Sequence, residues 1–302
     1  GTETLTAVAT DAAGNTSENG TREISVDTVA PTTTITIPDY INLANADSVP
    51  VTITSDENGT YTYTISDGNP LNDITDSDVI TANTPVELHL DLSDLADTTI
   101  TADVSVTDAA GNTGTADTDT ATKDTLAPTT PTIGLVAGDD VINITERTAG
   151  VEVTGTTEAG TTVTLNGKDA TVTGTTWTYT LTTDEIDAFG QGTETLTAVA
   201  TDAAGNTSEV TREISVDTVA PAAPTIGDVA DDDVINITER TAGVEVTGTT
   251  EAGTTVTLNG KDATVTGTTW TYTLTTDEID AFGQGTETLT AVATDAAGNT
   301  SE

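Results

Sequence analysis

Aspartates recur in this sequence at regular intervals, each at the start of the same short motif. The letters D-A-A-G-N begin at Asp11, Asp108, Asp202 and Asp295, which are spaced 97, 94 and 93 residues apart. Carboxylates are hard oxygen ligands, and Ca²⁺ takes about six to eight oxygens from carboxylates, carbonyl groups and water. Crowded carboxylates repel one another, and a divalent ion removes that cost. The chemistry that these residues could perform is therefore calcium binding.

Three sources of carboxylate are expected to meet where consecutive repeats join end to end. They are the turn aspartate of D-A-A-G-N, the aspartate of the linker that follows, and aspartates in an early loop of the next repeat. The turn and linker candidates are Asp11, Asp27, Asp108, Asp124, Asp202 and Asp217. The loop candidates are Asp139, Asp140, Asp231, Asp232 and Asp233, with Asp39 in the corresponding place at the first junction. These residues predict Ca²⁺ as a cofactor bound at the junctions.

A second interpretation of the turn aspartates stays open, because D-A-A-G-N is also good turn chemistry. Aspartate accepts hydrogen bonds from backbone N–H groups, and Gly14, Gly111, Gly205 and Gly298 can take the positive φ that a tight turn requires. The motif is not an EF-hand, since its glycine stands at the fourth position instead of the sixth.

Short alternating segments must position these aspartates. Apolar and polar residues alternate in the stretches 141–145, 151–156, 161–167, 170–174, 177–183, 194–201 and 211–216, and 185–190 could form a helical turn. Seven short strands in about 93 residues are typical of an immunoglobulin-like β-sandwich. Trp177 and Trp270 lie opposite small alanines, so we assign both rings to the core. The predicted fold is all-β, with tandem immunoglobulin-like sandwiches arranged end to end.

The spacing of the motif also divides the chain into segments. A period near 95 residues exceeds that of a solenoid unit, about 20–50 residues, and suits a whole small β-domain. Residues 139–209 and 232–302 are the same 71 letters. We predict a C-terminal fragment of an Ig-like repeat at 1–27, a divergent Ig-like domain at 28–124, a repeat at 125–217, and a repeat lacking its last strand at 218–302. Strands of the divergent domain are expected near Ile35 and Val51 and at 60–65, 86–92 and 100–108.

The charge balance excludes several classes of partner. Fifty acidic residues and seven scattered basic ones give a formal net charge of −43. Nucleic-acid binding needs clustered Lys and Arg, and an anionic membrane surface would repel the chain, so we predict neither nucleic-acid binding nor membrane insertion. No enzyme is predicted either, because the chain has no Cys and no catalytic sequence motif. Its one histidine, His89, alternates with Leu88 and Leu90 and should face solvent.

The linkers between segments contain proline. They begin D-T-V-A-P at 27–31 and 217–221 and D-T-L-A-P at 124–128. Proline restricts itself and its predecessor to extended conformations, so these linkers should be short and semi-rigid.

The sequence starts and stops inside repeats. The segment 1–27 carries the strand T-R-E-I-S-V-D at Thr21–Asp27 without a sandwich of its own, and 218–302 lacks that strand. We expect the first segment either to be disordered or to complete the last repeat of another copy by head-to-tail strand addition. The alternative is that the sequence is a window from a longer array. Neighbouring repeats of the same chain are the other expected partners.

Taken together, D-A-A-G-N-T-S, V-D-T-V-A-P and D-D-V-I-N resemble the bacterial Ig-like repeats of giant surface adhesins, the biofilm-associated and type I-secreted, RTX-type adhesins of Gram-negative bacteria. The resemblance implies a tandem array at the bacterial cell surface, outside the cell, with Ca²⁺ at domain junctions. It implies an extender, or spacer, that holds a distal adhesive tip away from the cell. Two alternatives stay open: a ligand- or carbohydrate-binding adhesion domain with Tyr40, Tyr61 and Tyr63 as its platform, and an accessory module of a secreted enzyme.

Overall fold

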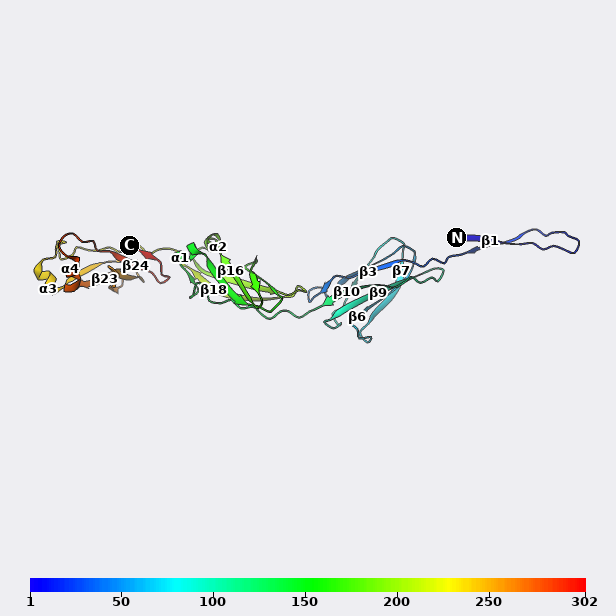
Figure 1. Cartoon of the computed structure of the whole chain (residues 1–302), viewed down its shortest axis with the longest axis horizontal. Coiled ribbons are helices and arrows are strands. Elements are labelled where there is room, and N and C mark those ends of the chain that lie inside the picture. Colours follow the sequence, from blue (N-terminus) through cyan, green and yellow to red (C-terminus); the bar gives the residue numbers. More distant parts are fainter. The chain divides into compact units, whose positions relative to one another are not determined.

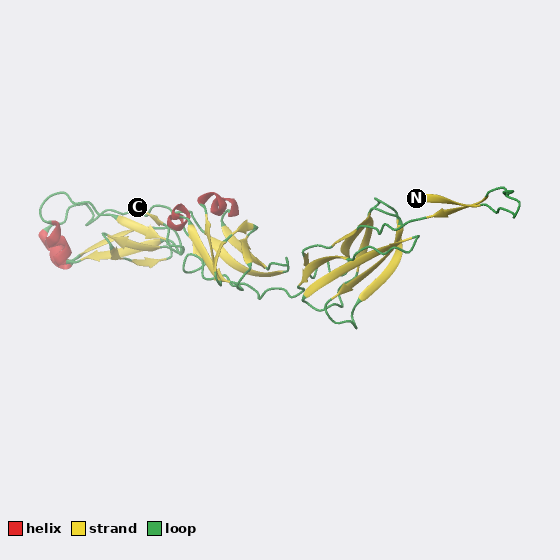
Figure 2. Cartoon of the chain, turned by 45° about the vertical axis from the view of Figure 1, so that its right-hand side comes forward, coloured by secondary structure: helices red, strands yellow, loops and turns green.

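The computed structural model describes residues 1–302, and the chain divides into two compact units. The first unit comprises residues 1–127 and 202–206, and the second comprises 128–201 and 207–302. Strands make up most of the regular structure of both units, and the helices are short (Figure 2). None of the helices combines the length and the apolar character needed to cross a bilayer. The predicted all-β class is confirmed.

The first unit contains a sandwich of two sheets (Figure 1). One sheet has the order β4 (Tyr40–Ile41), β10 (Asp117–Lys123), β9 (Thr99–Asp108), β6 (Gly59–Ser66) and β7 (Ile74–Ile80). The other has the order β3 (Thr33–Thr36), β5 (Val49–Ser55) and β8 (Val86–Leu90). Along β9 every second residue from Ile100 to Val106 is buried in the core between the sheets, as the alternation predicts. His89 on β8 is exposed, also as predicted.

Three strands of this sandwich lie outside the predicted stretches: the two-residue β4 and the longer strands β7 and β10. β7 reads I-T-D-S-D-V-I and β10 reads D-T-D-T-A-T-K, and most of their side chains are exposed or half-buried. β7 is an edge strand, and β10 buries only Ala121 and Lys123, so neither strand needs an apolar stripe. The buried Lys123 ammonium pairs with Asp97 at 3.0 Å and donates to the Leu95 carbonyl at 2.6 Å, which offsets the cost of burying its charge.

The second unit contains two sandwiches, of which the first spans the residues from Ile133 to Val216. Its sheets have the orders β11-β18-β17-β13-β14 and β12-β16-β15. The bounds are β11 (Val141–Ile142), β12 (Val151–Thr156), β13 (Thr162–Leu165), β14 (Lys168–Asp169), β15 (Thr171–Thr173), β16 (Thr176–Leu181), β17 (Gly192–Thr201) and β18 (Thr207–Val216). Trp177 on β16 is fully buried, as predicted, and its Nε1 donates to the Thr132 carbonyl at 3.1 Å.

The second sandwich of this unit repeats the first, but one of its sheets has fewer and shorter strands. Its sheets have the orders β21-β20-β24-β25 and β19-β23-β22. The bounds are β19 (Val244–Thr249), β20 (Thr255–Leu258), β21 (Lys261–Asp262), β22 (Thr264–Thr266), β23 (Thr269–Leu274), β24 (Ala291–Thr294) and β25 (Thr300–Ser301). Trp270 is fully buried, as predicted. β24 has four residues where its counterpart β17 has ten.

Four short helices lie in the second unit, and the first of them replaces the end of a predicted strand. The predicted strand 141–145 is wrong after Ile142: Asn143 accepts from the backbone amides of Thr145 and Glu146, and this cap starts α1 (Ile144–Ala149). The predicted helical turn at 185–190 is confirmed within α2 (Thr183–Phe189). The helices α3 (Ile237–Ala242) and α4 (Thr276–Phe282) are the equivalents in the second sandwich. An Arg147–Asp187 ion pair holds α1 against α2.

The segment 1–27 forms a two-stranded hairpin. β1 (Thr2–Ala7) pairs with β2 (Gly20–Ser25) in antiparallel register, and Figure 2 shows no third strand against them. Nearly every residue of the hairpin is exposed, including Leu5 at 55% and Val26 at 46%. The hairpin therefore has no core of its own.

Candidate metal centre and junction asparagines

Each D-A-A-G-N motif forms the same tight turn. In the copy that follows β9, Asp108 Oδ1 accepts from the backbone amides of Ala110 and Asn112, both at 2.8 Å. Its Oδ2 accepts from Asn112 Nδ2 at 2.8 Å, and Gly111 has a φ of +92°. The side-chain hydrogen bond from Asn112, followed by backbone hydrogen bonds, holds the pKa of Asp108 below its usual 3.8. The aspartate is therefore a charged turn residue, with lone pairs left on both oxygens.

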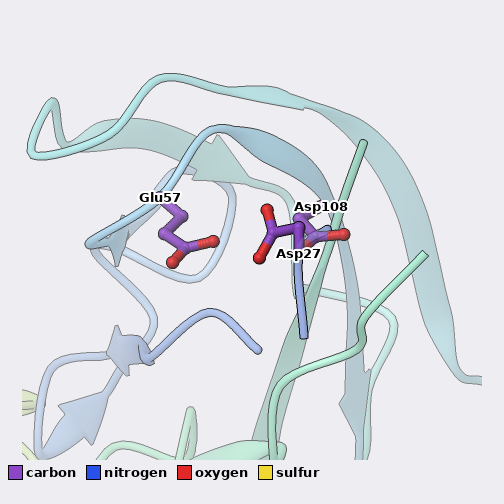
Figure 3. Close-up of side chains that lie close together, drawn as sticks. All are labelled: Asp27, Glu57 and Asp108. Atoms are coloured by element: carbon purple, nitrogen blue, oxygen red, sulfur yellow. The ribbon is translucent and has the colours of Figure 1, made fainter. Parts of the chain in front are cut away.

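Three carboxylates from separate parts of the first unit converge beside this turn (Figure 3). Asp27 comes from the linker before the sandwich, Glu57 from the turn after β5, and Asp108 from the end of β9. One oxygen of each lies within 4.8 Å of the others. None of the three takes part in an ion pair with Lys or Arg. We call Asp27, Glu57 and Asp108 the acidic triad.

The acidic triad carries an electrostatic cost that a cation would remove. Desolvation raises the pKa of Glu57 above its usual 4.5, and the charges of Asp27, Asp56 and Asp108 raise it further. Three hard carboxylate oxygens close together, with no basic partner, fit the ligand preference of Ca²⁺. A bound Ca²⁺ would supply positive charge that keeps all three side chains ionised and close together.

The structure groups the candidate aspartates differently from the predicted sets. Asp108 lies with Asp27, the linker aspartate before its own repeat, and not with Asp124 after it. Glu57 was absent from the candidates, although its D-E-N-G context marks it as an acidic residue in a turn. Asp11 lies in the exposed turn of the N-terminal hairpin, where Asn15 bonds its carboxylate. Neither Asp11 nor Asp39 joins the acidic triad.

The loop aspartates are engaged in local contacts. Asp140 receives two hydrogen bonds from Arg212, at 2.7 Å from Nε and 2.5 Å from Nη2, and one from the backbone amide of Val136. Asp139 accepts from the backbone amide of Val141. In the second sandwich Asp232 accepts from Val234 and Asp233 from Val229, while Asp231 takes a positive φ of 70°. The Arg212 guanidinium lowers the pKa of Asp140, so this carboxylate already has a cationic partner.

The asparagine of each turn makes contacts that the sequence analysis missed. Asn299 is 1% exposed and its Nδ2 donates to the carbonyl of Asp217 and to the Asp295 carboxylate, both at 2.9 Å. Its Oδ1 accepts from the backbone amide of Ile144 at 2.8 Å. One side chain thus joins the first sandwich of the second unit, the linker and the turn of the following sandwich. We call Asn112, Asn206 and Asn299 the junction asparagines.

The other junction asparagines reach the linker in the same way. Asn206 Nδ2 donates to the carbonyl of Asp124 at 2.9 Å, and its Oδ1 accepts from the backbone amide of Leu43 at 3.0 Å. Asn112 Nδ2 donates to the carbonyl of Asp27 at 3.3 Å. Each linker aspartate is therefore held by the turn of the repeat that follows it in the chain. Nothing in a single sequence separates this role from that of an ordinary turn asparagine.

Comparisons with known proteins place this arrangement in a family. No protein-family model matches the chain, and no curated protein sequence does either. Among solved structures, a Ca²⁺-stabilized adhesin that helps an Antarctic bacterium reach out and bind ice is 32% identical, over 99% of this chain and 79% of that one, with a TM-score of 0.39. The chain belongs to the tandem immunoglobulin-like repeats of large bacterial adhesins. The resemblance expected from the repeated motifs is confirmed.

Two further adhesin structures are similar to this chain. A bacterial immunoglobulin-like domain from the M. primoryensis ice-binding adhesin is 32% identical, over 32% of this chain and all of that one, with a TM-score of 0.24. A 1.5-MDa bacterial ice-binding adhesin, described for host cell surface retention, is 26% identical over 92% of this chain and 96% of that one, with a TM-score of 0.37. The assignment to the family depends on the 32% identity to the Ca²⁺-stabilized adhesin over 99% of this chain.

Proposed function

We propose that this chain is an extender segment of a bacterial cell-surface adhesin, stiffened by Ca²⁺ bound where its repeats begin, and that it holds a distal adhesive tip away from the cell. The observation that carries the proposal is the convergence of Asp27, Glu57 and Asp108. The Ca²⁺-stabilized relative that helps its bacterium reach out supports both the ion and the mechanical role.

The acidic triad would act on the linker. Asp27 belongs to the linker, whereas Glu57 and Asp108 belong to turns of the folded sandwich. Without a cation, repulsion among the three carboxylates favours a displaced linker; with Ca²⁺ held between them, the linker is fixed to the sandwich. Weak sites of this kind respond to the millimolar Ca²⁺ outside cells, which suits an extracellular stalk.

The other two linker aspartates would give weaker calcium sites. Asp124 and Asp217 are joined to their turns by Asn206 and Asn299, as Asp27 is by Asn112. The nearby acidic side chains differ, however: Glu158 accepts from the backbone amide of Thr129, and Glu251 from that of Ala222. We therefore place the strongest site at the acidic triad. Calcium ligation by the remaining candidate aspartates stays a prediction.

The ligand-binding alternative requires an exposed aromatic surface, and two of its three tyrosines are buried. Tyr61 and Tyr63 are each 4% exposed and form part of the core of the first sandwich, where their rings stack with centroids 6.3 Å apart. The alternative that these two tyrosines belong to an exposed binding surface does not hold, because alternation along β6 points them inward. Tyr40 alone is exposed, at 46%. A single ring offers no extended surface for a carbohydrate.

Calcium titration tests the proposal. Isothermal calorimetry of the 302-residue chain should detect Ca²⁺ uptake, and Glu57→Gln should weaken the tightest site about tenfold through loss of one charged ligand. Glu87→Gln, on an exposed position of β8, is the matched control and should leave the affinity unchanged. X-ray scattering with and without a chelator should show a larger maximum dimension in Ca²⁺. Absence of any Ca²⁺ uptake would overturn the proposal.

A further inference from the structure

Each proline linker donates one backbone amide to a carboxylate in a turn of the sandwich that follows it. At the first linker the amide after the proline belongs to Thr32, and it donates to Asp56 Oδ1 at 2.7 Å. At the last linker the corresponding amide belongs to Ala222, and it donates to Glu251 Oε2 at 2.8 Å. Glu158 makes the same contact at the remaining linker. A carboxylate that accepts from a backbone amide makes a strong, charge-assisted hydrogen bond, so each linker is held without a metal ion.

A pair of bonded threonines shows which residues of the turns correspond. The hydroxyls of Thr34 and Thr54 lie 2.6 Å apart in the first unit, and those of Thr225 and Thr249 lie 2.7 Å apart in the last sandwich. In both cases the carboxylate that accepts the linker amide comes two residues after the second threonine. Asp56 and Glu251 are therefore counterparts in position as well as in contact.

The next position of the turn differs between the sandwiches. It is Glu57 in the first unit, whereas the two repeats have alanine there, the exposed Ala159 and Ala252. Because Asp56 already accepts the linker amide, Glu57 is left to join the acidic triad. In each repeat the turn has a single carboxylate, and the linker amide occupies it.

The two aspartates of the acidic triad have close counterparts at the last linker. Asp217 Oδ1 accepts from the backbone amide two residues ahead at 3.3 Å, as Asp27 Oδ1 does. Asp295 accepts from the backbone amides two and four residues ahead and from the side chain of its turn asparagine, as Asp108 does. What this junction lacks is a counterpart of the third carboxylate.

A buried hydroxyl also distinguishes the first unit. Thr33 is 6% exposed, and its Oγ1 has no hydrogen-bond partner. It lies opposite Ser55, the residue before Asp56, so the hydroxyl is at the same end of the core as the acidic triad. The residues that likewise precede the first threonine of the bonded pair in the repeats are Pro131 and Pro224, which carry no hydroxyl. An unpartnered buried hydroxyl is costly unless a ligand or its water bonds to it.

We infer that this turn separates two tasks. Its first carboxylate, Asp56 or Glu251, anchors the linker without a metal ion, and the position that follows decides whether the junction also holds Ca²⁺ tightly. Glu57 and the free hydroxyl of Thr33 supply the second task in the first unit, and Ala252 leaves it out of the last sandwich. The calcium part of this inference rests on the proposed function, whereas the anchor does not.

Moving the third carboxylate to the last sandwich tests the calcium part. In calorimetry of the 302-residue chain, Ala252→Glu should add one Ca²⁺ site with an affinity within about tenfold of that of the acidic triad. Ala252→Gln has nearly the same shape without the charge and should add none. If the unchanged chain takes up Ca²⁺ but Ala252→Glu adds no site, this inference is wrong and the proposed function stands. Absence of uptake by the unchanged chain would overturn the proposed function together with the calcium part.

The hydroxyl of Thr33 is tested by a change that should act in opposite directions on affinity and stability. Thr33→Val should weaken the tightest Ca²⁺ site about fivefold, because a buried partner for the ion or its water is lost. The chelated chain should melt at a higher temperature, because the unpartnered hydroxyl is gone. An unchanged Ca²⁺ affinity would overturn the role of Thr33.

The anchor is tested without calcium. In the presence of a chelator, Asp56→Ala should accelerate amide hydrogen exchange at Thr32 about tenfold, because the acceptor of that amide is removed. Glu57→Ala, the same truncation one residue along, should leave exchange at Thr32 unchanged. Equal effects of the two variants would contradict the separation of tasks.

Discussion

The backbone amide of Ile144 donates to the side chain of Asn299, 155 residues further along the chain, at 2.8 Å. Ile144 is the first residue of α1, where amides have no intrahelical acceptor, and Asn299 supplies one from the turn of the next sandwich. The same asparagine holds the carbonyl of Asp217. The buried side chain of Asn299 therefore forms hydrogen bonds with α1, with the linker and with its own turn.

Replacing this asparagine should loosen the junction within the second unit. Asn299→Ala leaves the Ile144 amide and the Asp217 carbonyl without partners, at a cost of about 1–3 kcal/mol. Amide hydrogen exchange at Ile144 should accelerate accordingly. Asn15→Ala is the matched control, since Asn15 makes the same turn bonds to Asp11 in the exposed hairpin. Unchanged exchange at Ile144 would show that the bridge contributes nothing.

Calcium binding at the acidic triad should depend on pH in a defined window. The raised pKa of Glu57 means that this carboxylate takes up a proton above pH 4.5, whereas Asp108, whose pKa is lowered, stays ionised to below 3.8. Protons compete with Ca²⁺ for carboxylate oxygen, so the affinity should fall first as pH drops through the pKa of Glu57.

Without Ca²⁺, the contribution of Glu57 to stability has the opposite sign. Its folded-state pKa is above the unfolded one, so the folded chain binds the proton more tightly and gains stability as pH falls through that range. Melting curves of the chelated chain from neutral pH to about pH 4 should show this gain, and Glu57→Gln should abolish it. A calcium affinity that stays constant down to the range of Asp108 would argue against Glu57 as a ligand.

The Asp140–Arg212 pair should stabilise the first sandwich of the second unit. Asp140→Asn removes a bidentate, partly exposed ion pair and should lower the melting temperature of that sandwich by about 4 °C. Arg212 lowers the pKa of Asp140, so the contribution is present above pH 3.8 and is lost as pH falls through the lowered value. Asp233→Asn is the control, because Asp233 has the same sequence neighbours and accepts from the Val229 amide as Asp140 does from Val136, but it forms no ion pair. Equal shifts in the two variants would contradict the assigned role of the pair.

Gly155 should be intolerant of a side chain. An added Cβ would come within 1.9 Å of the Thr132 carbonyl oxygen and 2.6 Å of the Trp177 ring. Both neighbours are fixed, since the indole donates to that same carbonyl in a fully buried position. Gly155→Ala should therefore cost at least about 2 kcal/mol in chemical denaturation, and a smaller loss would mean that the core can move to accept a methyl group.

Period-two alternation was a sufficient signal for strands that bury one face. β6, β9 and β16 follow it, and so does the burial of Trp177. β7 and β10 escaped prediction because an edge strand and a strand with few buried residues need no apolar stripe. The strand predicted at 141–145 failed because Asn143 acts as a helix cap, a local effect that competes with alternation.

The sequence predicted individual site residues better than it predicted which of them lie together in the fold. The recurrence of D-A-A-G-N pointed to the turn and linker aspartates, and one of each lies in the acidic triad. Whether a turn aspartate lies near the linker before its repeat or the linker after it depends on which end of the sandwich the turn occupies. The spacing of the motif along the sequence is compatible with either end. Glu57 enters the acidic triad through the β5–β6 turn, whereas Glu158 and Glu251 of the corresponding turns accept from backbone amides of the linkers.

The hydrogen bond from Ile144 to Asn299 is made by a V-I-N-I segment on one side and a D-A-A-G-N turn on the other. Every full copy of the repeated 71 letters contains both the donor segment and the acceptor turn of this hydrogen bond. Gain or loss of whole copies by recombination consequently restores the same hydrogen bond at each new boundary between repeats. The number of repeats in such an array can thus change in whole-repeat steps without any compensating substitution.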